Sequence, residues 1–225
     1  MSSREVVLGN VRKALNRCAG NRAAGLIPTT LAAPRLRVPI MDRNRYGTLF
    51  GENFENLAGK CIFLKESGEV VPALAELLQG KTAVASNAPF LDACGVTGLP
   101  QVQSGFTDRE ALRAVCATAD VGITSADYAL AETGTLVMLS SPQEPRMISL
   151  LPPAHIAVFP RSRLLANLDE LLSVLPNPAE QTSSMVLITG PSRTADIEQI
   201  LVRGVHGPGE IFAVIVGQAI GDSGG

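Results

Sequence analysis

Cysteine and histidine are scarce in this sequence, and they are not grouped in the way that metal sites require. The 225-residue chain has four cysteines, none of them in a CxxC pair, and two histidines. This spacing shows neither a four-ligand zinc site nor a cysteine-bound iron–sulfur cluster. We therefore expect no cofactor in this chain.

Long apolar runs are missing as well. The longest candidate, residues 211–220, is interrupted by Gly217 and Gln218, whereas a membrane span requires roughly 18 uninterrupted apolar residues. The N-terminal sequence contains no apolar signal core. These features predict a cytoplasmic protein with no membrane span.

Common nucleophile and nucleotide motifs are also absent. The sequence has no GxSxG elbow between a predicted strand and a predicted helix, no GxGxxG fingerprint after a strand and no GxxxxGK[ST] phosphate loop. These absences argue against a serine hydrolase of the usual type, classical dinucleotide binding and a P-loop nucleotidase.

Basic residues are concentrated near the N-terminus. Residues 1–45 hold nine basic and two acidic side chains, although the whole chain has a formal charge of −2. Aromatic residues are not interleaved with them, so we expect no nucleic-acid partner. We expect instead that this basic segment forms an arm over the protein's own acidic body or over a partner.

A capping box at Ser2 and Glu5 predicts a helix, and the prolines after it predict an irregular strap. Residues 1–47 are thus expected to precede an α/β domain in 48–225.

Short apolar runs alternate with helical patterns from residue 60 onward. The runs are CIFL at 61–64, TAVA at 82–85, VGIT at 121–124, TLVML at 135–139, IAVF at 156–159, VLIT at 186–189 and IFAVIV at 211–216. Helix starts are predicted at Thr107 with Glu110 and at Asn167 with Glu170. The pattern predicts a three-layer α/β/α fold with a mainly parallel mixed sheet. Between residues 121 and 139 two runs are too close for a helical crossover, which predicts a hairpin or sharp turn.

The first candidate site is the segment 125–139. Ligands of open α/β sheets gather beyond the carboxyl ends of strands, so loops that leave the apolar runs are the places to search. Here Glu132, Thr133, Gly134 and Thr135 combine a carboxylate, two hydroxyls and accessible backbone amides. The carboxylate suits a nucleophile, a general base or a ligand to a cation. The alternative is a surface turn whose glutamate is solvated and whose glycine permits a positive φ.

The second candidate site is the segment 187–210. Its candidate ligand-binding residues are Thr189, Gly190, Ser192, Arg193, Thr194, Asp196 and Gly207. A short helix is predicted at 195–198, and backbone amides at its start would suit a phosphate or carboxylate. Asp196 would repel an anion there and is alternatively a loop anchor or an acceptor for a cationic group. His206 is either an accessible acid or base, or a donor to loop carbonyls.

Three segments, taken in order, resemble one family. ADYALAETGTLVML, RMISLLPPAHIAVF and ITGPSRTADIEQILVRGVHGPGEIFAVI look like the lactate utilization protein C family, the single-domain branch of proteins with a LUD domain. The resemblance implies a fold similar to ribose-phosphate isomerases, glucosamine-phosphate deaminases and CoA transferases. It also implies a role in oxidising L-lactate to pyruvate with two partners, an iron–sulfur oxidoreductase subunit and a LUD-plus-ferredoxin subunit. Iron–sulfur clusters are then expected in those partners.

Three hypotheses follow for the function. In the first, this chain is a non-redox subunit of a lactate-oxidising complex that binds a small carboxylate or a partner through the two loops. In the second, it is a stand-alone enzyme on a phosphorylated or acyl-CoA substrate, with Glu132 as the catalyst by loose analogy to CoA transferases. In the third, it is a module that senses a small ligand. Fold alone does not choose among them.

Overall fold

The computed structural model describes residues 3–14, 42–197, 200–204 and 206–217, and of residues 193–197 and 200–203 it describes the backbone alone. The chain divides into two compact units, residues 1–40 and 41–225. Helix α1 (Ser3–Ala14) belongs to the first unit. Most of the predicted strap lies outside the described residues.

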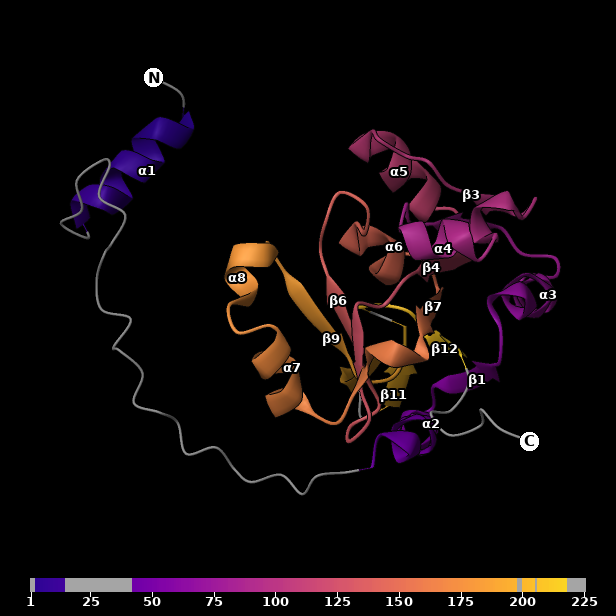
Figure 1. The fold of residues 1–225 in the computed structure, drawn as a ribbon. Coiled ribbons are helices and arrows are strands. Elements are labelled where there is room, and N and C mark those ends of the chain that lie inside the picture. Colours follow the sequence, from indigo (N-terminus) through magenta and orange to yellow (C-terminus); the bar gives the residue numbers. More distant parts are fainter. Residues whose placement is uncertain (1–2, 15–41, 198–199, 205, 218–225) are drawn as a thin grey trace. The chain divides into compact units, whose positions relative to one another are not determined.

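The centre of the second unit is a fully parallel sheet of six strands (Figure 1). Its spatial order is β1 (Lys60–Leu64), β12 (Glu210–Val216), β7 (Ala154–Pro160), β4 (Val121–Thr124), β2 (Ala83–Ala85) and β3 (Val102–Gln103). The side chains of β2, β4 and β7 are buried on both faces apart from the end of β7. This double burial explains why these strands read as continuous apolar runs rather than as alternating ones.

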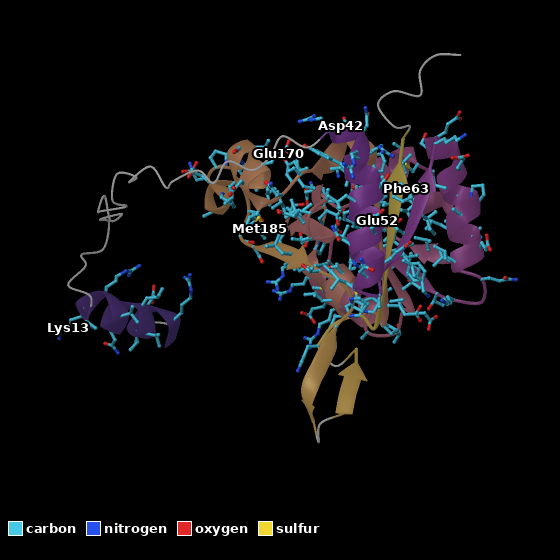
Figure 2. All side chains as sticks on the ribbon, turned by 90° about the horizontal axis from the view of Figure 1, so that it is seen from below. Lys13, Asp42, Glu52, Phe63, Glu170 and Met185 are labelled. Carbon is cyan, nitrogen blue, oxygen red and sulfur yellow. The ribbon has the colours of Figure 1, made fainter. Side chains whose placement is uncertain are left out.

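Helices cover one face of this sheet, and helices together with a second sheet cover the other. Helix α3 (Val70–Leu77) and helix α4 (Pro89–Ala93) pack on the first face. The second face is covered by α2 (Tyr46–Asn56), α5 (Arg109–Cys116) and α6 (Arg146–Leu150). Figure 2 shows Phe63 of β1 beside α2. The predicted three-layer α/β class with a mainly parallel sheet is confirmed.

Gly122 of β4 allows α6 to approach the sheet closely. A Cβ atom at this position would lie 1.9 Å from the carbonyl oxygen of Ile148 in α6. That separation is far below any van der Waals contact, so only glycine fits here. The close packing of α6 in turn fixes the loop that leads into it, residues 140–145.

The second sheet has four strands and is mixed. Its order is β8 (Leu164–Leu165), β5 (Tyr128–Leu130), β6 (Thr135–Leu139) and β9 (Met185–Ile188). Strands β5 and β6 form the hairpin predicted between residues 121 and 139. The runs at 135–139 and 186–189 therefore leave the main sheet and pair antiparallel with each other. Helix α7 (Leu168–Val174) packs on this sheet, and α8 (Pro178–Gln181) precedes β9.

Short elements connect these layers. They are the 3₁₀ turns η1 (Arg43–Arg45), η2 (Ser67–Glu69), η3 (Val96–Gly98) and η4 (Arg161–Arg163). Helix α2 begins at Tyr46, before the expected domain boundary at residue 48. Asp42 and Glu170 are both labelled in Figure 2, and the adjacent Arg43 bonds to Glu170 at 3.2 Å, which ties η1 to α7.

The helix predicted at 195–198 is wrong for the residues that the structure describes. Strand β10 (Arg193–Ile197) instead pairs antiparallel with β11 (Ile200–Arg203). The local signals for a helix start are outweighed by pairing with the β-branched and apolar partner strand. None of the helices in the described part of the chain combines the length and apolarity needed to cross a membrane.

Candidate functional site

The two loops predicted from sequence meet through threonine hydroxyls. Thr135 Oγ1 lies 2.9 Å from Thr189 Oγ1 and accepts or donates a second bond of 2.7 Å with Thr133 Oγ1. Gly134, at φ 59°, lies directly against the backbone of Phe54 in α2. The hydroxyl chain thus joins the β5–β6 turn to the end of β9 beside α2.

The remaining predicted residues extend from this cluster. Gly190 lies against Leu57, and Ser192 receives the backbone N–H of His206 at 3.4 Å. Gly207 is half-buried and a Cβ built on it would be 3.6 Å from Ser192. The side chains of Arg193, Thr194 and Asp196 lie outside the described part of the structure.

This cluster does not lie at the carboxyl edge of the main sheet. Gly209 donates to Pro153 O, and Ser192 donates to Pro208 O, so the loops surround the points where β7 and β12 begin. Segment 125–139 does follow the carboxyl end of β4, but its turn at Glu132–Thr135 lies between β5 and β6 of the second sheet, and segment 187–210 leaves β9 of that same sheet. Glu132 is exposed, and its backbone carbonyl accepts from Asn53 Nδ2 at 2.9 Å.

The carboxyl edge itself carries a different cluster of polar side chains. Ser86 follows β2, Ser125 follows β4, and Arg163 lies just beyond β7 in η4. Glu144 reaches them from the loop between β6 and α6. Because carboxyl ends of parallel strands are where α/β sheets bind ligands, this cluster is the stronger candidate site.

Glu144 is an acid enclosed by the protein. Its residue is 8% exposed, and Oε1 accepts from Ser86 Oγ at 2.9 Å and from the Ser125 backbone N–H at 2.7 Å. The other oxygen, Oε2, is buried and has no hydrogen-bond partner among the described residues. A buried oxygen without a partner is costly when charged, which favours the protonated carboxyl.

Burial therefore changes the acidity of this group. Desolvation raises the pKa of Glu144 to about 8, against the lowering effects of the bonds from Ser125 and Ser86. The nearby carboxylate of Asp127 raises this pKa further, and Arg163 lowers it. Desolvation also raises the pKa of Asp127, which accepts the Leu139 backbone N–H at 2.7 Å. Two carboxyls and one guanidinium thus lie close together where they are largely buried, a combination typical of functional sites.

Arg163 is the cation of this cluster and is half-buried. Its Nη1 donates to Ser125 Oγ at 3.0 Å and to the carbonyl of Ala126. The guanidinium carbon lies 5.9 Å from the centre of the Phe90 ring. Its other N–H groups make no hydrogen bond with described residues, so they are free to receive a carboxylate in the bidentate way that guanidinium favours.

Neighbouring side chains hold the cluster in place. Asn87 donates to Phe106 O at 2.9 Å and accepts from Gly105 N at 2.8 Å, while its backbone N–H binds Gln143 O at 2.9 Å. Asn87 therefore links the end of β2 to the loop that carries Glu144. Rigid support of this kind keeps an acid positioned.

His155 lies inside the sheet beside this edge. It is fully buried in β7, with Nε2 2.8 Å from Thr124 Oγ1, while Nδ1 has no partner among the described residues. Desolvation lowers its pKa to about 4, so the ring is neutral at physiological pH. Its burial and its bond with Thr124 give His155 a structural role within the sheet.

Sequence reasoning missed Glu144, although a signal existed. Ser86 and Ser125 directly follow two predicted strands, which is where the carboxyl-edge rule directs the search. Glu144 itself sits in the sequence SSPQEPR with no motif around it. Only the packing of α6 on β4 brings it to the edge.

The three described cysteines lie in separate elements. Cys61 is in β1, Cys116 is in α5, and Cys94 follows α4. Burial raises the pKa of the Cys61 thiol to about 12 and of the Cys116 thiol to about 11. No cluster of potential metal ligands occurs in the described ranges.

Comparison with known proteins agrees with this architecture. The LUD domain family matches residues 48–216. Lactate utilization protein C of Halalkalibacterium halodurans is 33% identical over 95% of this chain and 97% of its own length. The Shouchella clausii protein of the same name is 35% identical over 67% of this chain and 70% of its own.

A solved structure shows the same fold. A DUF162 family protein from Deinococcus radiodurans superposes with a TM-score of 0.61 at 19% identity, covering 79% of this chain and 99% of that one. The sequence segments quoted above, the fold and these matches all agree. The chain belongs to the LUD domain family, in its lactate utilization protein C branch.

Proposed function

We propose that this chain is a non-redox subunit of a system that oxidises L-lactate to pyruvate. The observation that carries the proposal is the match along almost the whole length of a protein named for lactate utilization. The expected partners of this chain are an iron–sulfur oxidoreductase subunit and a LUD-plus-ferredoxin subunit.

Within that system, the carboxyl-edge cluster would bind a small carboxylate. The free N–H groups of Arg163 would hold the carboxylate, and Ser125 Oγ lies beside them at 3.0 Å from Nη1. Glu144, which keeps its proton at neutral pH, would give or take a proton near the bound anion. Since Glu144 Oε2 is closed off from solvent, a ligand would reach it only if the residues around it move.

The test of the role is genetic and biochemical. Deletion of the gene should abolish growth of the source organism on L-lactate while growth on glucose continues. A tagged copy should restore growth and copurify with the two expected partners, and the isolated chain should not oxidise lactate. Normal growth of the deletion strain on L-lactate would reject the proposal.

A stand-alone transferase or isomerase remains the second candidate. A buried acid that holds its proton, as Glu144 does between the Ser86 hydroxyl and the Ser125 N–H, suits a general acid. The sequence-based candidates Glu132 and His206 stay predictions. Turnover of an acyl-CoA or sugar phosphate by the purified chain, lost in Glu144→Gln or in Glu132→Gln, would support this reading and identify the catalyst.

A further inference from the structure

Three arginines line one cavity away from the carboxyl-edge cluster. The cavity, of about 570 Å³, lies among α5, α6 and the segments 140 and 183–184. Arg109 and Arg113 come from α5, and Arg146 is the first residue of α6 (Figure 1). None of the three makes a salt bridge or side-chain hydrogen bond with any residue in the described ranges, so their charges are uncompensated there.

The remaining lining residues favour an anion. Glu110 is the only acidic residue among them, which leaves a formal charge of +2 on the wall. Ser140 Oγ, also in the lining, is buried without a hydrogen-bond partner among the described residues. An unsatisfied buried hydroxyl costs free energy, and a rotation of this side chain toward the cavity would let it donate a hydrogen bond to an incoming oxygen anion.

A second cavity adjoins the first and has a different character. It has a volume of about 550 Å³ and shares Arg109 and Met147 with the first. Its lining also includes the apolar Phe106, Leu112 and Pro145, polar side chains such as Asn87, and the carboxylate of Asp108, which accepts the Ala111 N–H at the start of α5. The two cavities meet at Arg109 and Met147. A ligand that lies across this boundary would have the arginines at one end and the apolar side chains at the other.

Each cavity falls within the size range of small-molecule sites, which is about 300–1,000 Å³. Guanidinium groups recognise phosphate and carboxylate oxygens through paired N–H donors, and several arginines favour a ligand with more than one negative charge. The apolar second cavity favours an organic body attached to that charged group.

We propose that Arg109, Arg113 and Arg146 bind the phosphate or carboxylate groups of an amphipathic small molecule whose apolar body occupies the adjoining cavity. This inference goes beyond the proposed function and involves residues outside the Glu144 cluster. The ligand would also contact the loop that leads from Ser140 to Glu144, where Glu144 N–H donates to Ser141 Oγ at 3.0 Å.

The experiment is calorimetric titration of the full chain with five probes. They are 1-naphthyl phosphate, neutral 1-naphthol, inorganic phosphate, pyrophosphate and citrate. We expect 1-naphthyl phosphate to bind at least tenfold more tightly than inorganic phosphate or naphthol, because only it joins an anionic group for the arginines to an apolar ring for the adjoining cavity. The order of pyrophosphate and citrate then distinguishes a phosphate ligand from a carboxylate ligand.

Variants connect the binding to the arginines. Arg113→Gln and Arg146→Gln should each weaken 1-naphthyl phosphate binding by about tenfold or more. Arg12→Gln, which removes the same charge from α1 in the other unit, should leave the affinity unchanged. Thermal unfolding without ligand checks that each variant is folded. Absence of binding by all charged probes, or equal affinity in folded arginine variants and wild type, would overturn the proposal.

These results are independent of the lactate role. A chain that binds 1-naphthyl phosphate through the three arginines but whose deletion leaves growth on L-lactate normal would support this inference and reject the proposed function. The reverse combination would do the opposite.

Discussion

Replacing Glu144 by glutamine should stabilise the folded chain, and the gain should grow with pH. Desolvation raises the pKa of Glu144 to about 8 in the folded chain from an ordinary value of 4.5. Between these two values the folded state holds a proton that the unfolded state has released. The stability of the wild type therefore falls as pH rises through this window. Glutamine has no proton to lose and escapes this effect, while its amide oxygen can still accept from Ser86 and Ser125.

The size of the effect follows from the two pKa values. One pKa unit corresponds to about 1.4 kcal/mol. Relative to strongly acidic solution, the difference in Glu144 pKa between the two states lowers the wild-type free energy of unfolding by about 1 kcal/mol near pH 5, about 3 kcal/mol near pH 7 and about 5 kcal/mol near pH 9. The difference between Glu144→Gln and wild type should grow by about 3–4 kcal/mol between about pH 5 and pH 8.

Guanidinium chloride denaturation of both proteins at a series of pH values measures this difference. Glu132→Gln is the matched control, because Glu132 is exposed and forms no side-chain hydrogen bond with a described residue. Its difference from wild type should stay constant across the series. A constant difference for Glu144→Gln as well would refute the reasoning, since it would mean that Glu144 ionises alike in folded and unfolded chains.

Three further predictions concern the fold. Burial lowers the pKa of His155 to about 4 from 6.5. On acidification the unfolded state therefore gains a proton first, and the folded state loses stability as pH falls below about 6.5. His155→Gln should reduce this loss by up to about 3 kcal/mol in acid denaturation. Gly122→Ala forces a Cβ to within 1.9 Å of Ile148 O and should cost about 3 kcal/mol or more, whereas Gly98→Ala, with open space around it, should change the denaturation midpoint little. Asn167→Ala removes the bond that its side chain accepts from Glu170 N at 3.1 Å and should cost about 1 kcal/mol, measured in the same way.

Local sequence signals predicted the elements of the main sheet well. The runs at 61–64, 82–85, 121–124, 156–159 and 211–216 all form parallel strands. The α7 cap at Asn167 is confirmed, and the α5 cap lies at Asp108, one position after the predicted Thr107. Continuous burial and helix caps are local properties, so they can be recognised without knowing the rest of the chain.

Pairing partners were harder to predict than elements. The runs at 135–139 and 186–189 have the composition of central strands, yet they pair with each other in the second sheet. The β10–β11 hairpin replaced a predicted helix because contact between two strands outweighed local helix signals. Such choices depend on contacts that no short segment contains.

The candidate site shows the same limit. Thr135 and Thr189 lie in the two segments chosen as candidate sites from the sequence, and the structure joins their hydroxyls. Glu144 could not be found in this way, because its character comes from burial beneath residues from three distant segments. A glutamate between Gln143 and Pro145 has no special acidity in the sequence alone.

The most direct test is the rate of L-lactate oxidation by the complex reconstituted from this chain and its two expected partners. We predict that Glu144→Gln and Arg163→Lys lose most of the activity, while Glu132→Gln retains it. Denaturation curves of the variants check that each is folded. Full activity with Glu144→Gln and loss with Glu132→Gln would contradict the account and place the functional centre at the threonine turns instead.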